Sequence, residues 1–510
     1  MLATSRSGFV LGIDAHPVEV QVDISPGLPY FNIVGLPEAS VKESRERVKS
    51  AIKNCGYPFP TNRITINLAP ADVKKEGSGL DLPIALAILC AQEVIPQEEL
   101  SKYAVVGELS LDGAVKKNRG ILPLSLAAKG WDGSSLIVPD ENAQEASVVE
   151  GTDVYPANHL SQVVQFLSKI EEITPQKTDI DALFSQHSTY HFGFQDVIGQ
   201  EHAKRALEIA AAGGHNVLMI GPPGSGKTML ARRLPTILPP LTFEEAIETT
   251  AVYSVSGLLP GEMPLMTQRP FCSPHHTISD AGLIGGGAIP RPGQVSLAHN
   301  GVLFLDELPE FKKNVLESLR QPLEDGHVTI SRASITLSFP SRFSLVCAQN
   351  PCPCGHFGDS LHSCMCNPRQ ISMYRSRISG PLLDRIDIQI EVPAVPYKEL
   401  GKTVQGENSD SIRKRVISTR DIQSQRFKDI PIHCNAQMSS REIRKLCKLS
   451  GACSKLLETV SKKLGLSARA YHRIIKIART IADIEGAPDI LEPHIAEAIQ
   501  YRSLDRNRPA

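Results

Sequence analysis

The chain opens with a regular alternation of hydrophobic and polar residues. Between residues 18 and 24, valine and isoleucine alternate with polar side chains, which predicts a half-buried β-strand. Later periodic stretches predict a helix over residues 38–55 and a strand over residues 64–68. An apolar helix is expected over residues 82–90, and two short strands around a turn over residues 103–113. This mixture predicts an α+β domain over residues 1–168.

The pattern changes after this first domain. The apolar period fades over residues 169–192, which predicts a linker. Short apolar runs at residues 216–220 and 301–305 then predict strands that are buried on both faces of a sheet. We therefore expect two further domains, an α/β core and a helical C-terminal domain, over residues 193–398 and 399–510.

The first apolar run leads directly into a glycine-rich turn, here called the phosphate loop. Unpaired backbone N–H groups at such a turn, together with the dipole of the following helix, bind phosphate. In this pattern Lys227 reaches the β- and γ-phosphates, and the hydroxyl of Thr228 is a ligand of Mg²⁺. The sequence thus predicts an ATP site formed by Gly221, Pro222, Pro223, Gly224, Ser225, Gly226, Lys227 and Thr228.

The second apolar run ends in two acidic residues, Asp306 and Glu307. Open α/β sheets bind their ligands at the carboxyl ends of the strands, where this pair is expected. Asp306 is predicted to hold Mg²⁺ through water, and Glu307 to polarise the water that attacks the γ-phosphate. Phosphate loop and acidic pair together predict Mg²⁺-dependent ATP hydrolysis.

Composition limits the setting of this chemistry. With 41% hydrophobic and 21% charged residues, the 510-residue chain has the composition of a globular protein. Its 54 Lys+Arg against 55 Asp+Glu give a net charge of −1, so any nucleic-acid surface must be local. No apolar segment is long enough to span a bilayer, and we expect a cytoplasmic protein without a membrane partner.

A hairpin is predicted after the acidic pair. Residues 328–331 and 335–337 alternate as strands around a polar turn that contains Arg332, and a strand over 343–348 follows. An arginine at a hairpin tip is a candidate contact to a nucleic-acid phosphate, or else a solvated turn residue. A Gly/Pro/His-rich insertion also separates the two ATP motifs, over residues 271–294.

Two Cys-x-Cys pairs follow, in a stretch here called the cysteine loop, residues 350–368. Four thiolates suit a closed, structural Zn²⁺ site, which leaves no open position for catalysis. Reduced free thiols or a redox disulfide are the alternatives, and His356 and His362 are substitute ligands. The predicted zinc ligands are Cys352, Cys354, Cys364 and Cys366.

The order of motifs in residues 75–122 resembles the proteolytic domain of Lon. That family requires a serine nucleophile and a lysine base, but Gly79 and Leu122 fall at these two positions. The resemblance therefore implies a Lon-like domain without proteolytic activity, used for assembly or DNA contact. A shifted dyad is the alternative, in which Ser78 pairs with Lys74, Lys75 or Lys116.

The core resembles AAA+ ATPases, in the branch that holds magnesium chelatases and MCM helicases. This likeness implies a P-loop core with a helical lid, and pore-facing insertions. It places Val197 and Ile198 beside adenine, or in the plain core, and makes Asn350 the sensor 1 residue that orients water. Arg385 becomes the arginine finger that reaches a neighbouring subunit's γ-phosphate, and Arg469 the sensor 2 arginine.

Other assignments of these arginines stay open. Arg385 can instead form an ion pair with Asp384 or Asp387, while Arg375 or Arg377 serves as the finger. Arg473, one helical turn after Arg469, is the second candidate for sensor 2. Lysine and arginine far outnumber acids over residues 439–479, which gives the lid a local basic surface.

Taken together, the motifs resemble the ComM/YifB family of magnesium-chelatase-like AAA+ ATPases over nearly the whole chain. The resemblance implies a homo-hexameric ring that acts on single-stranded and branched DNA. It further implies helicase activity in branch migration, during homologous recombination of incoming DNA in natural transformation. A motor that remodels a protein partner and an ATP-dependent Lon-like protease are the alternatives.

Overall fold

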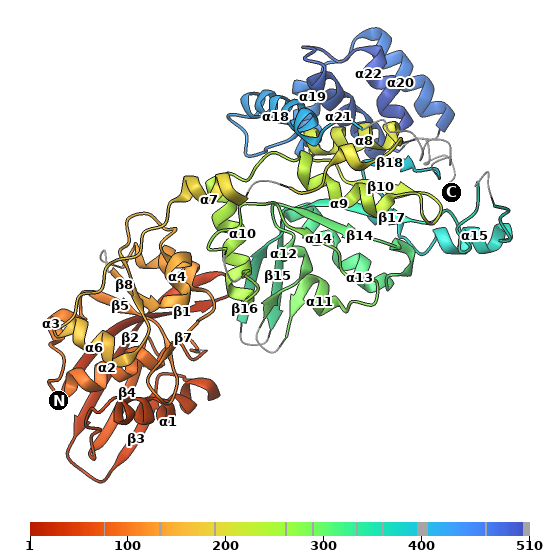
Figure 1. Cartoon of the computed structure of the whole chain (residues 1–510). Coiled ribbons are helices and arrows are strands. Elements are labelled where there is room, and N and C mark those ends of the chain that lie inside the picture. The colour runs from red at the N-terminus through yellow and green to blue at the C-terminus, as the bar shows by residue number, and fades with distance from the viewer. Residues whose placement is uncertain are drawn as a thin grey trace. The chain divides into compact units, whose positions relative to one another are not determined.

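The computed structural model describes the chain except residues 76, 132–134, 188–189, 261–262, 288–289, 333–334, 359–361, 395–405, 465–466 and 503–510, and the side chains of residues 39–40, 186–187 and 464. The described residues form two compact units (Figure 1). The first comprises Met1–His187, Phe243–Thr267 and Ser331–Phe339. The second comprises Ser188–Thr242, Gln268–Ile330 and Pro340–Ala510.

A seven-stranded mixed sheet forms the first unit, in the order β3-β4-β2-β1-β5-β8-β9. Strands β1 and β2 are antiparallel, as are β2 and β4, whereas the pairs β3/β4, β1/β5, β5/β8 and β8/β9 are parallel. The strands are β1 (Leu2–Leu11), β2 (Asp14–Ser25), β3 (Tyr30–Val34), β4 (Arg63–Ala69), β5 (Tyr103–Val105), β8 (Ser135–Pro139) and β9 (Val154–Ala157).

Helix α2 (Asp81–Ala91) lies at the centre of the first unit. All of its residues are buried, as the continuous apolar sequence predicts. The carboxylate of buried Asp81 accepts a hydrogen bond from Arg47 Nε at 2.6 Å, which compensates for its burial. The other helices of this unit are α1 (Ala39–Asn54), α3 (Gln97–Leu100), α4 (Ile121–Ala128), α5 (Asp140–Ala146), α6 (Leu160–Leu167), α7 (Ile180–His187) and α10 (Phe243–Ser256).

The two short strands predicted within residues 103–113 are present as β5 and β6 (Glu108–Leu109), but they belong to different sheets. Strand β5 joins the main sheet, and the chain then leaves it at Gly107, whose N–H donates to the carbonyl of Gly79 at 2.9 Å. The hairpin forms one turn later, between β6 and β7 (Val115–Lys116). A non-local backbone contact therefore lies between the two strands.

The second unit contains a five-stranded parallel sheet in the order β11-β14-β17-β10-β18. All four residues of β14 and all of β10 except its last are buried, which explains their continuous apolar runs. The strands are β10 (Val217–Ile220), β11 (Phe271–Cys272), β14 (Val302–Leu305), β17 (Ser344–Gln349) and β18 (Ile388–Glu391).

Helices and insertions complete the core of this unit. Helices α8 (Glu201–Gly213) and α9 (Lys227–Ile237) contribute to the same hydrophobic core as β10 and β18. Strands β15 (His327–Arg332) and β16 (Ile335–Pro340) form the predicted hairpin, of which Ser331–Phe339 is counted with the first unit. Its turn residues 333–334 lie outside the described ones. The insertion between the ATP motifs contains α11 (Asp280–Ile284), β12 (Gly285–Gly286), β13 (Arg291–Pro292) and α12 (Gln294–Leu297). Shorter helices follow β14 and β17, namely α13 (Lys313–Ser318), α14 (Arg320–Asp325), α15 (Pro368–Arg375) and α16 (Gly380–Leu383).

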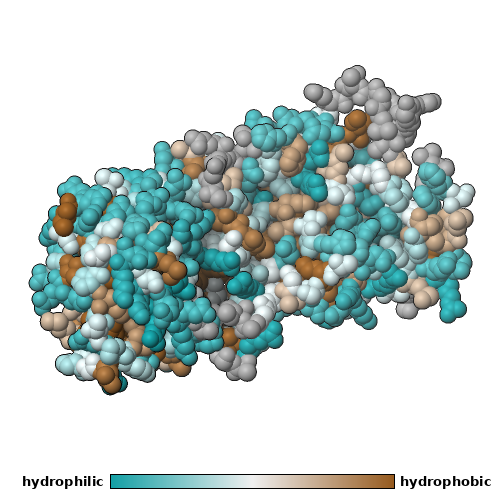
Figure 2. Space-filling model, turned by 60° about the horizontal axis from the view of Figure 1, so that its bottom comes forward, coloured by the Kyte–Doolittle hydropathy of each residue, from teal (hydrophilic) through white to brown (hydrophobic). Residues whose placement is uncertain are grey.

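The C-terminal region is helical and packs on the core, since both share one hydrophobic cluster. Its helices are α18 (Ser409–Arg426), α19 (Ser440–Leu446), α20 (Gly451–Leu464), α21 (Ala468–Ile484) and α22 (Glu492–Gln500). None of the helices among the described residues has the length and hydrophobicity needed to cross a membrane. On the face shown in Figure 2, hydrophobic residues form scattered groups among hydrophilic ones.

Candidate nucleotide site

Glycines give the phosphate loop its backbone conformation. Gly224 and Gly226 have φ angles of +75° and +90°, in the left-handed region that glycine adopts most readily. A Cβ on Gly221 would lie 2.1 Å from the carbonyl oxygen of Val392, so no side chain fits there. Helix α9 begins directly after Gly226 and directs its unpaired N–H groups into the loop.

Lys227 lies inside this loop and is 8% exposed. Its Nζ donates hydrogen bonds to the carbonyls of Gly221 at 2.7 Å and Pro222 at 2.9 Å, and to Asn350 Oδ1 at 3.3 Å. Burial lowers the pKa of Lys227, against the opposing charges of Asp306 and Glu307. The structure therefore brings the predicted phosphate-binding lysine and the predicted sensor 1 residue together.

The residues predicted to hold Mg²⁺ are also adjacent. Thr228 Oγ1 donates to Asp306 Oδ2 at 2.8 Å, although 78 residues separate them in sequence. A hydroxyl and a carboxylate are the hard oxygen ligands that Mg²⁺ takes beside phosphate oxygens and water. The donor set of the two motifs therefore fits this ion.

Glu307 has a partner that the sequence analysis missed. His276 Nδ1 lies 3.3 Å from Glu307 Oε2. His276 comes four residues after β11, which is the parallel neighbour of β14. Neighbouring parallel strands end at the same edge of a sheet. The position of His276 just after β11 could therefore have predicted that it lies near Glu307.

Adenine contacts were predicted at Val197 and Ile198. Val197 is buried in the hydrophobic core, which matches the plain-core alternative, whereas Ile198 is half-buried. Gln200, two residues later, donates from Nε2 to the carbonyl of Pro393 at 2.6 Å and to that of Ser225 at 3.4 Å. This segment therefore contacts the phosphate loop through Gln200.

Arg385 lies among residues of its own chain. It forms an ion pair with Glu324, and its Nη1 donates to the carbonyl of Pro381 at 2.7 Å. Arg385 therefore forms an ion pair within the chain, as in the alternative prediction. Its partner, however, is Glu324 of α14 rather than Asp384 or Asp387.

The remaining candidate arginines differ in their surroundings. Arg469 is 73% exposed, and its Nη1 donates to Asp384 Oδ2 at 3.3 Å. Arg473 is mostly buried and donates to the carbonyl of Ile386 at 2.8 Å. Arg377 makes two hydrogen bonds with the carboxylate of Glu310, at 2.9 and 2.8 Å. Arg375 Nε donates to the carbonyl of Pro351 at 3.4 Å.

Buried hydrogen bonds connect Asp387, two residues after Arg385, to the C-terminal helical region. Asp387 Oδ2 lies 3.1 Å from His215 Nδ1, and His215 Nε2 lies 2.9 Å from the hydroxyl of Thr480 in α21. Burial alone would raise the pKa of Asp387, but the hydrogen bond with His215 and the charge of Arg473 hold it well below its usual range. Asp387 is therefore ionised and anchors Arg473.

The four cysteine sulfurs of the cysteine loop lie within 4.8 Å of one another. Cys352 Sγ lies 3.3 Å from Cys354 Sγ and 3.7 Å from Cys364 Sγ, and the latter two are 3.6 Å apart. Hydrogen bonds from the backbone of His356 and Met365 lower the pKa of Cys354 to about 6. The donor set fits a thiolate-binding metal such as Zn²⁺.

In the segment whose motifs resemble Lon, Gly79 and Leu122 stand at the positions predicted for the serine and the lysine. A Cβ on Gly79 would lie 2.3 Å from Asn118 Nδ2, and Leu122 is fully buried in the core. Ser78 donates its hydroxyl to the carboxylate of Glu108, and Lys75 is buried with its ammonium group on the carbonyl of Pro70. In this structure the hydroxyl of Ser78 is therefore paired with an acid.

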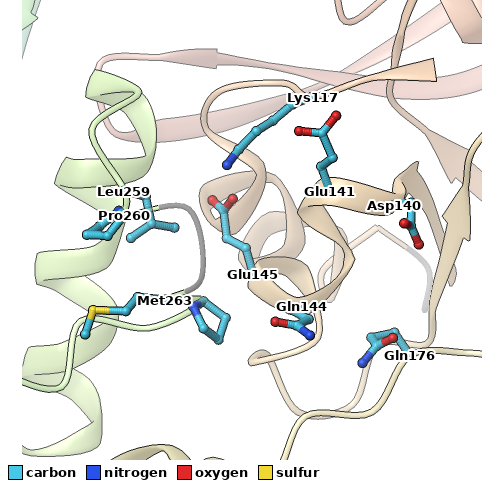
Figure 3. A pocket seen from close by; sticks show the side chains of 10 residues that line it. Lys117, Asp140, Glu141, Gln144, Glu145, Gln176, Leu259, Pro260 and Met263 are labelled. Carbon is cyan, nitrogen blue, oxygen red and sulfur yellow. The ribbon is translucent and has the colours of Figure 1, made fainter. Parts of the chain in front are cut away.

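A polar cavity of about 260 Å³ also lies in the first unit (Figure 3). Lys117, Glu141 and Glu145 line it, together with Leu259 and Met263. Glu145 accepts a hydrogen bond from the N–H of Leu122 at 3.1 Å, so this carboxylate supports the backbone of helix α4.

Comparisons with known proteins identify the family. The sequence family described as magnesium chelatase, subunit ChlI, matches residues 193–400, and the family described as its C-terminal part matches residues 406–502. A third family, described as subunit ChlI of Mg-chelatase, matches residues 20–142. Competence protein ComM of Haemophilus influenzae is 48% identical over 512 residues, which cover 99% of this chain and 98% of the relative. The chain belongs to the ComM/YifB family of magnesium-chelatase-like AAA+ ATPases.

Two further relatives match this chain over very different lengths. The protein YifB of Escherichia coli is 46% identical over 507 residues, covering 99% of this chain and 98% of the relative. Lon protease 2 of Bacillus subtilis is 34% identical over 154 residues, which cover 28% of this chain and 26% of that protein. The chain therefore combines an AAA+ core with a helical C-terminal region, as the family matches indicate.

Proposed function

We propose that this protein is an ATP-driven motor that moves single-stranded and branched DNA and promotes branch migration when incoming DNA recombines. The ATP site of the second unit supports the motor. The similarity to a competence protein over 99% of the chain supports the DNA substrate and carries the proposal.

In this proposal the phosphate loop binds ATP and Lys227 contacts its β- and γ-phosphates. Thr228 and Asp306 hold Mg²⁺, which neutralises charge on the phosphate oxygens when it is bound. Glu307 accepts a hydrogen bond from the attacking water, and Asn350 orients that water. Positioning and charge neutralisation account for most of the catalysis of phosphoryl transfer.

A ring supplies the rest of the site. Arg385 leaves Glu324 and contacts the γ-phosphate bound by a neighbouring subunit, while Arg469 acts as sensor 2 and Val197 and Ile198 flank adenine. Six subunits close the ring around DNA, which the hairpin residue Arg332 contacts at a phosphate. The Lon-like part aids assembly without proteolysis, the cysteine loop holds Zn²⁺, and the protein works in the cytoplasm.

The test compares ATP hydrolysis with no DNA, with single strands, with duplex and with a four-way junction. We expect hydrolysis to rise with single-stranded and branched DNA, and Glu307→Gln to bind ATP without hydrolysing it. Hydrolysis that ignores every DNA form would contradict the proposal, and stimulation by a protein partner instead would favour a chelatase-type motor. Casein cleavage that is lost in Ser78→Ala would favour a protease.

A further inference from the structure

We propose that the four-cysteine site is a structural support of the nucleotide site, in which thiolate-bound Zn²⁺ fixes the cysteine loop against the phosphate loop and is required for tight ATP binding. This inference rests on the ATPase proposed above and concerns the regulation of that same site. It follows from the geometry of the sulfurs, from the hydrogen bonds around them and from the contacts of the loop on either side.

The sulfurs are arranged as a tetrahedral ion requires. With Zn–S bonds of about 2.3 Å, the sulfurs of a tetrahedral site lie about 3.8 Å apart. The separations of 3.3, 3.6 and 3.7 Å among Cys352, Cys354 and Cys364 are close to that value. Cys366 completes the set, within 4.8 Å of the others.

Backbone N–H groups surround the sulfurs. Phe357 N–H donates to Cys352 Sγ at 3.3 Å, and the backbone of His356 and Met365 donates to Cys354. Such hydrogen bonds orient metal ligands and disperse the negative charge of thiolates. The loop thus supplies both the four ligands and the groups that position them.

The same turn packs on the phosphate loop. Gly355 N–H donates to the carbonyl of Cys352 at 3.0 Å, so Gly355 is held in the turn that carries the first two ligands. A Cβ on Gly355 would lie 2.7 Å from Pro223 Cδ and 2.9 Å from Pro223 Cγ. Pro223 belongs to the phosphate loop, which therefore touches the first metal-binding turn directly.

The other end of the cysteine loop returns to Asn350. Asn367, next to Cys366, begins α15 by accepting the N–H of Gln370 at 2.9 Å. Arg375 at the end of α15 donates to the carbonyl of Pro351, and the backbone of Asn350 donates to Tyr374. A metal bound by both Cys352 and Cys366 therefore links the two ends of the cysteine loop next to Asn350, the proposed sensor 1 residue.

Among the described residues of the cysteine loop, Cys352 is buried, but the large apolar side chains of Phe357 and Met365 are 45% and 90% exposed. Ordering a glycine- and proline-rich loop costs conformational entropy, and these two exposed side chains offset little of it. Metal binding supplies the missing free energy because binding and ordering are coupled.

The first experiment measures zinc content and ATP affinity of the full chain. We expect one zinc ion per wild-type chain by elemental analysis. Cys354→Ser should lose the metal and raise the Kd of a fluorescent ATP analogue about tenfold. Cys55→Ser, a half-buried cysteine of the first unit, is the matched control and should change neither quantity.

A glycine pair separates metal binding from its effect on the phosphate loop. Gly355 and Gly358 both have left-handed φ angles, +86° and +80°, but only a methyl group on Gly355 meets Pro223, because nothing lies within 4 Å of one on Gly358. We expect Gly355→Ala and Gly358→Ala to keep zinc, and only Gly355→Ala to weaken ATP binding. This comparison remains informative if Cys354→Ser does not fold.

Two results would overturn the inference. One is a wild-type chain that takes up no zinc, even after anaerobic incubation with Zn²⁺ and reductant. The other is equal ATP affinity in zinc-loaded chains and in chains whose zinc has been removed with a thiol reagent. ATP affinity is measured without DNA, so failure of the DNA-motor proposal would show separately, as hydrolysis that DNA does not stimulate.

Discussion

At the scale of single residues, the contact between His276 and Glu307 is the feature with the clearest catalytic consequence. Glu307 has a φ of +51° and a largely exposed carboxylate, so few other contacts fix its direction. The imidazole, 3.3 Å away, supplies that constraint. His276 is thus a positioning residue for the group proposed to orient water.

We predict that His276→Ala lowers the kcat of ATP hydrolysis about tenfold and leaves the Kd for ATP unchanged, because the base is misdirected while the phosphate loop stays intact. His275→Ala is the matched control, since His275 bonds Thr277 rather than Glu307. Steady-state kinetics and nucleotide titration check this. Equal kcat in the two variants would refute a positioning role.

Asp387, which forms a mostly buried ion pair with Arg473, predicts a pH-dependent stability difference. Removing one charge of a buried pair costs about 3–5 kcal/mol, so Asp387→Asn should lower the thermal midpoint at pH 7. Because the native pKa of Asp387 is depressed, its contribution is complete above the unfolded pKa of about 4 and declines as pH falls below it.

Scanning calorimetry at pH 7 and at pH 3.5 tests the predicted direction of this pH dependence of stability. The difference between wild type and Asp387→Asn should shrink at the lower pH. Asp384→Asn, which removes a pair with the exposed Arg469, should cost less than about 1 kcal/mol at either pH. A stability difference between wild type and Asp387→Asn that grows as the pH falls would contradict the conclusion that Asp387 is ionised in the folded protein.

At the scale of elements, the sequence predicts well the buried strands and the motifs that directly follow them. Both depend on residues that are adjacent in sequence. Strands β10 and β14 and the residues that follow them are continuous in sequence, so the phosphate loop and Asp306 were placed correctly beside each other. The partner of Arg385 was not predictable, because Glu324 lies 61 residues away on another helix.

The same limit explains why the sequence did not predict the pairing partners of β5 and β6 in the first unit. Between these strands the N–H of Gly107 donates to the carbonyl of Gly79, which is distant in sequence. His276 was missed because its role depends on the adjacency of β11 and β14. Local periodicity carries no information on either contact.

The β15–β16 hairpin provides a prediction at this scale. If exposed Arg332 contacts a DNA phosphate, Arg332→Ala should weaken DNA binding uniformly across sequences and reduce the slope of log K against log salt by about 1. Arg320→Ala, an exposed arginine of α14 paired with Glu317, is the control. Unchanged slopes in both variants would remove Arg332 from the DNA surface.

At the scale of the whole molecule, the proposed arginine finger requires that each ATP site be shared between two chains. We predict that Lys227→Ala and Arg385→Ala are each inactive in hydrolysis, while a mixture of the two regains measurable activity. In a mixed ring some interfaces combine an intact phosphate loop with an intact Arg385. No recovery after mixing and reassembly would argue that Arg385 acts within its own chain.

The central claim is that ATP hydrolysis at the phosphate loop drives movement of branched DNA. Its most direct measurement is branch migration of a labelled four-way junction by the full-length protein with ATP and Mg²⁺. We expect strand exchange by wild type and by Lys53→Ala, which changes an exposed lysine of α1, and none by Lys227→Ala. Equal branch migration by wild type and Lys227→Ala, or none by a wild type that hydrolyses ATP, would contradict it.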